Sequence, residues 1–313
     1  VFDDYSLLKL LNIMAPIKNV IVIGASGTIG ASIFKALVES SKFNVSVLTR
    51  PESTAEYDPS IKVFKSNYSE ASLAEAFKGQ DAVVSALGAA GMGEQIKIID
   101  AAVKAGVKRY LPSEYGSNTQ NEKATSLVPA FGFKVTVIEH LRELESKGLS
   151  WTAIETGPAF DFGLQIGLVG FNINTHEASI MDGGNQPFSA TNLSQIGNAV
   201  VAVLSKPDET ANQFIYVDSF TATQNQILAE LEKATGKKWT VTESTTEAAA
   251  NEGQKRFSKG DFSGLLLLLK TIMLGEGYGS NFTKDASLAN EKLGLPKQGL
   301  PETVAALVAG KSV

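Results

Sequence analysis

The sequence has no cysteine and only two histidines, His140 and His176, among its 313 residues. Without thiols, disulfide bonds, thiolate catalysis and cysteine-based metal sites are excluded. The two histidines are not spaced as a pair of metal ligands, so we expect no structural metal site. The absence of cysteine is compatible with a reducing compartment, and we expect a cytoplasmic protein.

Basic blocks and long apolar runs are also missing. The formal net charge is −5, and lysine and arginine form no large cluster of the kind that binds phosphates in nucleic acids. The most apolar run, Leu265–Leu269, is far shorter than the roughly 20 residues that span a bilayer. We therefore expect neither a nucleic-acid partner nor a membrane partner.

The first residues do not resemble a signal peptide. Asp3 and Asp4 stand where such a peptide carries basic residues, and Met14 follows shortly afterwards. We expect residues 1–13 to be an extension that precedes the folded chain.

What the sequence does contain is a regular alternation of short apolar strands and amphipathic helices. Six β-branched or apolar runs are separated by helical segments and short links, which is typical of a Rossmann-type α/β fold with a doubly wound parallel sheet. The expected strands are Val20–Ile23, Val45–Thr49, Ile61–Phe64, Ala82–Ala86, Arg109–Leu111 and Trp151–Ile154. The pattern weakens afterwards. We expect a nucleotide-binding domain over residues 14–156 and a smaller, partly helical substrate lobe over residues 157–313, interleaved with the end of the sheet.

A glycine-rich turn follows the first expected strand. Residues 24–30 read Gly-Ala-Ser-Gly-Thr-Ile-Gly and open a helix. In a dinucleotide-binding turn the first glycine permits the sharp bend, the second admits the pyrophosphate, and the third lets helix and strand pack closely. We expect cofactor contacts from Gly24, Ser26, Gly27, Thr28, Ile29 and Gly30. The alternative is a glycine loop that binds nothing.

The end of the second strand indicates which cofactor is bound. An acidic residue there would accept from the ribose 2′-hydroxyl of NAD, whereas this chain has Thr49 and Arg50. A guanidinium suits a 2′-phosphate, so we expect NADP(H), although Arg50 could also be a solvated surface residue. Ser85, Ala86 and Leu87 end the fourth strand, at the edge where ligands bind in open sheets, and we expect them to contact the cofactor.

Taken in order, these segments resemble the isoflavone-reductase-like branch of the NmrA-like family, among the atypical short-chain dehydrogenases/reductases. The segments that carry the resemblance are Val20–Gly30, Leu48–Arg50, Asp81–Ser85, Arg109–Gly116, Lys134 and, more loosely, Phe214–Trp239. The resemblance covers nearly everything from Ile17 onward. It implies an NADPH-dependent reductase of an aromatic, phenolic or polyketide-like small molecule, with fungal relatives in secondary metabolism. Some relatives instead sense NADP without turnover and bind a protein partner, and this alternative stays open. We expect a monomer or a homodimer.

The resemblance also places the catalytic lysine of the enzymes at Lys134. The tyrosine that precedes such a lysine by four residues in common short-chain dehydrogenases is replaced here by Ala130. Lys134 would then act alone, as an acid or base or by placing the nicotinamide. From the residues alone, a solvated helix lysine is the competing interpretation. The chain departs from plant members at Ile138, where a basic residue is frequent, and at Ser66-Asn67, where Gly-Asp is frequent.

Further residues are candidates for contact with substrate. Ser113, Glu114 and Tyr115 end the fifth strand and should border the same crevice, or they form a capped turn. Phe160, Phe162 and Phe171 could line an aromatic pocket or could belong to the core. His140 lies six residues beyond Lys134 and is expected to be structural or exposed.

Overall fold

A computed structural model of the chain describes residues 16–313, so the extension expected at residues 1–13 lies outside the described residues. The chain forms two compact units, and each is assembled from separate stretches of sequence. The first unit contains the residues up to Ser113, Thr136–Ala153 and Gly197–Ile215. The second contains Glu114–Val135, Ile154–Ile196 and Tyr216–Val313.

The main sheet has seven strands in the order β10-β6-β5-β4-β1-β2-β3. The five pairings from β6 through to β3 are parallel, which confirms the doubly wound fold expected from the sequence. In chain order the strands are β1 (Asn19–Ile23), β2 (Asn44–Thr49), β3 (Lys62–Lys65), β4 (Ala82–Ser85), β5 (Arg109–Leu111), β6 (Ser150–Glu155) and β10 (Gln213–Tyr216).

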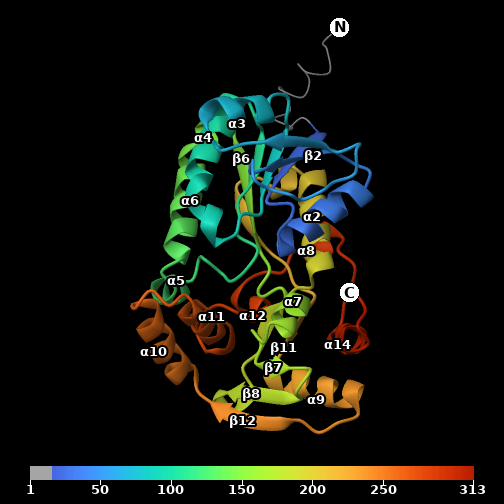
Figure 1. Cartoon of the computed structure of the whole chain (residues 1–313), viewed down its shortest axis with the longest axis vertical. Helices are drawn as coiled ribbons and strands as arrows, with labels where there is room; N and C mark the ends of the chain where they lie inside the picture. The colour runs from blue at the N-terminus through green and yellow to red at the C-terminus, as the bar shows by residue number, and fades with distance from the viewer. Residues whose placement is uncertain (1–15) are drawn as a thin grey trace. The chain divides into compact units, whose positions relative to one another are not determined.

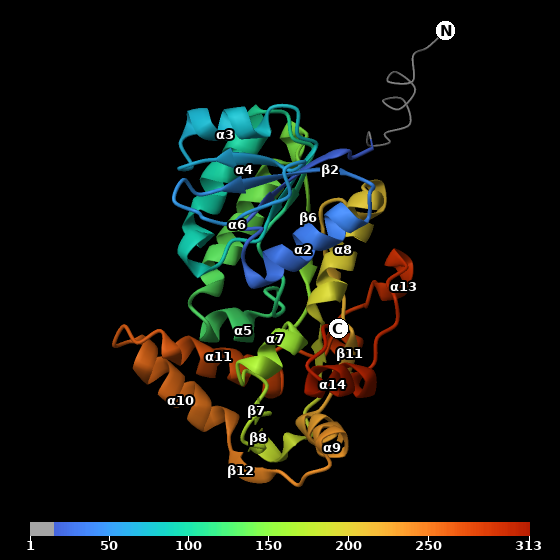
Figure 2. The ribbon, with the colours of Figure 1, turned by 45° about the vertical axis from the view of Figure 1, so that its right-hand side comes forward.

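Helices cover both faces of this sheet (Figures 1 and 2). One face carries α3, α4 and α6, and the other carries α2 and α8. Their bounds are α2 (Thr28–Glu39), α3 (Glu70–Phe77), α4 (Gln95–Lys104), α6 (Phe131–Glu143) and α8 (Leu193–Ser205). A short 3-10 turn over Glu145–Lys147 follows α6, and Gly148 ends it with a φ of 88°.

The central strands are buried because helices cover both of their sides. Val20, Ile21, Val22 and Ile23 of β1 are all fully buried, which explains why β1 reads as a continuous apolar run rather than an alternating one. The strand order reverses between β1 and β4, where Ile23 is paired with Ser85. Ligands of open α/β sheets bind at such a switch point, beyond the carboxyl ends of the strands.

The late stretch Gly197–Ile215 completes the first unit. A Cβ on Gly197 would lie 2.7 Å from both Ala36 Cβ and Ser32 O of α2, so α8 and α2 approach as closely as their backbones allow. The fully buried Arg109 of β5 donates to Thr210 Oγ1 (3.0 Å) and to Pro207 O (2.5 Å). The late stretch therefore closes both a helix face and a sheet edge of the first unit.

The second unit combines two small sheets with eight helices among the described residues. The sheets have the orders β12-β8-β7 and β11-β9. The strands are β7 (Phe171–Asn172), β8 (Glu177–Met181), β9 (Phe188–Ala190), β11 (Phe220–Ala222) and β12 (Thr240–Ser244). The helices are α5 (Glu122–Leu127), α7 (Phe160–Gln165), α9 (Gln224–Thr235), α10 (Thr246–Phe257), α11 (Ser263–Leu274), α12 (Phe282–Asp285), α13 (Asn290–Leu293) and α14 (Leu300–Val308). Over residues 16–313, none of the helices combines the length and the apolar character that a membrane span requires.

Candidate functional site

A pocket of about 460 Å³ opens in the first unit at the carboxyl ends of β1, β2 and β4. It lies at the switch point of the sheet, where a dinucleotide is expected to bind. It is lined by Gly24, Ala25, Ser26, Gly27, Leu48, Thr49, Arg50, Ser53, Tyr57, Tyr68, Ala86, Leu87, Gly88, Ala90, Gly91 and Glu94.

The three glycines of the turn have different structural roles. Gly24 has a φ of +82°, and a Cβ there would lie 2.4 Å from Ala86 O. A Cβ on Gly30 would lie 2.0 Å from Gly24 O, so Gly30 allows α2 to pack directly on the turn. Gly27 has an ordinary extended backbone (φ −78°, ψ 166°), and a Cβ there would meet only Gly24 O, at 3.3 Å. Gly24 and Gly30 are therefore required by the fold. Gly27 is not, but because it has no side chain, nothing extends from this position into the pocket.

Gly27 is also the residue that precedes α2, and no side chain caps this helix. The first turn of a helix carries N–H groups without helical partners and the positive end of the helix dipole, which together bind phosphate. The pocket wall formed by Gly24, Ser26 and Gly27 therefore fits a pyrophosphate. Thr28, Ile29 and Gly30 form the first turn of α2 rather than the lining of the pocket.

Arg50 lines the same pocket directly after β2. Its side chain is 64% exposed, and its Nε lies 3.4 Å from Glu52 Oε1. A solvent-exposed pair of this kind contributes little to stability, so the guanidinium can bind a phosphate with two hydrogen bonds. The lining also contains Tyr57, Tyr68 and Glu94, which the sequence patterns do not indicate. Tyr57 and Tyr68 lie outside the helices and strands, in segments without a periodic signal.

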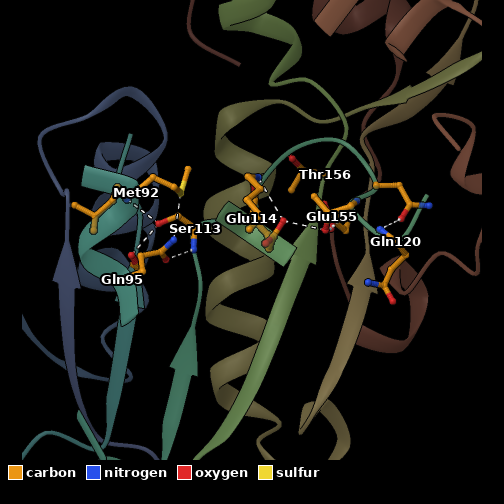
Figure 3. A network of polar contacts seen from close by, with 12 residues as sticks. Met92, Gln95, Ser113, Glu114, Gln120, Glu155 and Thr156 are labelled. Carbon is orange, nitrogen blue, oxygen red and sulfur yellow. Dashed lines mark hydrogen bonds and ion pairs between the residues drawn. The ribbon is translucent and has the colours of Figure 1, made fainter. Parts of the chain in front are cut away.

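Ser85 and Ser113 are joined in a buried hydrogen-bond network, part of which Figure 3 shows. Their hydroxyl oxygens are 2.8 Å apart, and Leu87 N donates to Ser113 Oγ at 2.9 Å. Ser113 N donates to Gln95 Oε1 at 3.0 Å. Ala86 and Leu87 line the pocket, whereas Ser85 and Ser113 lie behind that wall and fix the ends of β4 and β5. For Ser113, this arrangement supports the capped-turn interpretation.

The second unit contains a buried polar cluster around Lys134. Only 10% of the Lys134 side chain is exposed. Its Nζ donates to Glu114 O at 2.5 Å and lies 3.4 Å from Glu114 Oε2. Glu114, which follows β5, therefore holds the ammonium group through both its main chain and its side chain. Lys134 is not a solvated helix lysine.

A second carboxyl group, that of Glu155, belongs to the same cluster (Figure 3). Thr119 Oγ1 lies 2.9 Å from Glu155 Oε1 and 3.2 Å from Glu114 Oε2. Burial raises the pKa of Glu155 well above its ordinary value, and the nearby Glu114 raises this pKa further. Burial also raises the pKa of Glu114, although Lys134 opposes this shift. Closely spaced groups with perturbed pKa values are typical of functional sites.

Glu155 and Thr119 were not among the residues predicted from the sequence. A signal for Glu155 was present, because a carboxylate directly follows the apolar run Trp151–Ile154 and extends β6 by one residue. A charged residue at the carboxyl end of a buried parallel strand indicates a polar site. Thr119 lies in an irregular loop and has no comparable signal.

The remaining candidates lie mainly in packed surroundings. Phe160 is fully buried, with its ring centroid 4.9 Å from that of Phe220. Phe171 packs in the same core, and Phe162 is half-buried. Tyr115 is 6% exposed, with a φ of +29°. In the first unit, His140 Nε2 lies 2.7 Å from Asp100 Oδ1, which agrees with a structural role.

Comparisons with known proteins assign the chain to a family. Residues 16–252 match the NmrA-like family. Oxidoreductase aprR of Aspergillus flavus is 36% identical over 93% of this chain and 99% of its own length. The phenylcoumaran benzylic ether reductase IRL1 of Ginkgo biloba is 27% identical over 70% of this chain and 76% of its own length. Among solved structures, AtPrR2 with NADP+ and (+)pinoresinol aligns with a TM-score of 0.76 at 20% identity, over 94% of this chain and all of that one. The chain therefore belongs to the NmrA-like family.

Proposed function

We propose that the chain reduces an aromatic, phenolic or polyketide-like small molecule with NADPH, and that Lys134 is the acid–base or positioning group. At the level of reaction class, the chain is an NADP-dependent oxidoreductase. It belongs to the NmrA-like family, and a relative named as an oxidoreductase matches nearly its whole length. The cytoplasmic location and the monomeric or dimeric state remain predictions.

The observation that carries the proposal is the burial of Lys134 against Glu114. Lysine is rarely buried unless it is paired, and a lysine that only solubilised α6 would not need two oxygen partners. A desolvated ammonium at a fixed position is suited to give a proton to a substrate atom or to hold that atom in place.

The residues of the chain divide the work between binding and proton transfer. The first turn of α2, with Gly27, would hold the pyrophosphate, and Arg50 would hold the 2′-phosphate that distinguishes NADP from NAD. When bound, NADPH supplies the hydride. Lys134 supplies the proton, so that a carbonyl or a conjugated double bond gains one hydride and one proton. Glu114 keeps Lys134 oriented for this step.

NADPH oxidation tests the proposal, with acetophenone, menadione and chalcone as an aromatic ketone, a quinone and an enone. We expect turnover of at least one of these probes. Tight NADPH binding without oxidation of any probe would instead favour an NADP sensor that binds a protein partner.

A further inference from the structure

The Thr119 hydroxyl lies between two carboxyl groups, at 2.9 Å from Glu155 Oε1 and 3.2 Å from Glu114 Oε2. A hydroxyl carries one proton and can donate only one of these two hydrogen bonds. Both contacts are satisfied only when one of the carboxyl groups is protonated and donates to the Thr119 oxygen. The geometry therefore fits a cluster in which the two carboxyl groups share one proton.

Glu155 is the carboxyl group that fits the proton. Glu114 faces the Lys134 ammonium at 3.4 Å, which favours the ionised form of Glu114. Glu155 is fully buried, and its Oε2 has no hydrogen-bond partner. Burying an ionised carboxylate with an unpartnered oxygen costs far more free energy than burying the neutral acid does.

Two interactions oppose the protonation of Glu155, because Thr119 N donates to Glu155 Oε1 at 3.4 Å and the charge of Lys134 lowers the pKa of Glu155, but burial outweighs both. The Tyr216 hydroxyl donates to Asn118 Oδ1 at 3.1 Å. Burial raises the pKa of Tyr216. Tyr216 therefore remains a neutral phenol, and Lys134 is the cation of the cluster.

We propose that Glu155 stores a proton and passes it through the Thr119 hydroxyl and the Glu114 carboxylate to Lys134, which is thereby re-protonated after each turnover. This inference rests on the proposed function. It makes Glu155 and Thr119 relay residues that act through Lys134 and do not touch the substrate.

The proton balance of the relay is complete. Lys134 gives one proton to the substrate and becomes a neutral amine. The O–H bond of Glu155 breaks as its proton moves to Thr119 Oγ1, the Thr119 proton moves to Glu114 Oε2, and Glu114 passes a proton to Lys134 Nζ. Glu155 is left ionised, and one proton from solvent restores it. This is the one proton that reduction by NADPH consumes.

The stored proton is tested by infrared difference spectroscopy on the full chain without added ligand. At pH 7 the spectrum of the parent minus that of Glu155→Gln should show the C=O stretch of a protonated carboxyl group. The matched control is Asp161→Asn, which removes a buried carboxyl that accepts from Phe162 N and Leu193 N. That difference spectrum should show an ionised carboxylate. A carboxylate signal from Glu155 would overturn the proposal.

The transfer is tested with two substitutions at one position. Thr119→Val keeps the shape of the side chain and removes the hydroxyl, whereas Thr119→Ser keeps the hydroxyl. Because Lys134 starts protonated, Thr119→Val should oxidise the first NADPH per site at the parent rate. Its steady-state rate should then fall about tenfold or more, as expected for an impaired acid–base step. Thr119→Ser should recover most of the steady-state rate. The substrate is whichever of acetophenone, menadione and chalcone the parent reduces fastest.

The two phases separate failure of the relay from failure of the proposed function. If Thr119→Val leaves the steady state unchanged, or slows both phases equally, the relay is wrong and Lys134 can still be catalytic. If Lys134→Met keeps the parent rate in both phases, the proposed role of Lys134 is wrong and the relay has no acceptor. If no probe is reduced, the infrared comparison alone decides whether Glu155 stores the proton.

Discussion

The pocket of the first unit and the polar cluster of the second are built on opposite principles. The pocket depends on missing side chains, because Gly24 and Gly27 line it and Gly30 lets α2 pack on the glycine turn. The cluster depends on titratable side chains and a hydroxyl group that are buried away from water and contact one another. Substitutions that add a side chain should therefore impair cofactor binding in the pocket. Substitutions that remove a titratable group or a hydroxyl group should impair the function of the cluster.

The largest expected effect is in the pocket. Gly27→Val should abolish NADPH binding while the protein stays folded, because the backbone of Gly27 suits any residue and the new side chain would occupy the place of a phosphate. Circular dichroism and fluorescence titration measure the two properties. Gly30→Val is the contrasting variant and should lose the fold, since even a Cβ would lie 2.0 Å from Gly24 O. Undiminished NADPH affinity in Gly27→Val would show that the phosphates bind elsewhere.

In the cluster, Lys134→Ala should lower turnover about 100-fold or more, the usual size of a lost acid–base group. The affinity for NADPH should change much less, because the glycine turn and Arg50 provide the phosphate contacts. Single-turnover NADPH oxidation beside a binding titration tests this difference. A lower melting temperature with unchanged activity per folded molecule would assign Lys134 a structural role.

A smaller effect is expected at the edge of the pocket, where Arg50 is expected to distinguish NADPH from NADH by binding the 2′-phosphate. The parent should bind NADPH more tightly than NADH. Arg50→Ala should lower the ratio of these two affinities about tenfold, which is the effect expected for the loss of one charge-assisted hydrogen bond. Fluorescence titrations with both cofactors provide the measurement. Glu52→Gln serves as a control, since it removes the carboxylate that faces Arg50 and should leave the preference for NADPH intact. Equal affinity of the parent for the two cofactors would contradict this reading of Arg50.

The last expected effect is on stability rather than on cofactor binding or turnover, and it is the pH dependence caused by Glu155. Its pKa is raised in the folded state, so only the unfolded chain ionises there as the pH rises above about 4.3. The contribution of Glu155 to the free energy of unfolding should then fall by up to about 1.4 kcal/mol per pH unit until the folded state also ionises. Glu155→Gln removes this dependence. Urea unfolding of the parent and of Glu155→Gln at several pH values should show that the variant becomes more stable relative to the parent as the pH rises. A difference in the free energy of unfolding that does not change with pH would mean that Glu155 is ionised throughout.

The same contrast explains what the sequence could predict. Buried parallel strands are continuous apolar runs and the phosphate turn needs glycine at fixed spacing, so the sheet and the wall formed by Gly24, Ser26 and Gly27 were visible from local patterns. The Glu114–Lys134 pair joins residues 20 positions apart, and Glu155 lies a further 21 positions along the chain. A local pattern carries no information about such a contact. The sequence also does not decide whether Phe160 lies in the core or lines a pocket, because an aromatic residue in a loop or short helix suits both places.

The late stretch Gly197–Ile215 has a consequence for how the protein is made. During synthesis, the helix face of α2 and the edge of β6 emerge long before α8 and β10, which cover them. The Arg109 guanidinium also lacks two of its hydrogen-bond acceptors, Thr210 Oγ1 and the Pro207 carbonyl, until these later residues have been synthesised. The nascent nucleotide-binding unit must therefore remain open, with an unpaired strand edge that invites aggregation, until the ribosome has passed residue 215. A fragment that ends after β6 would carry the complete glycine turn and yet lack the elements that close its own unit.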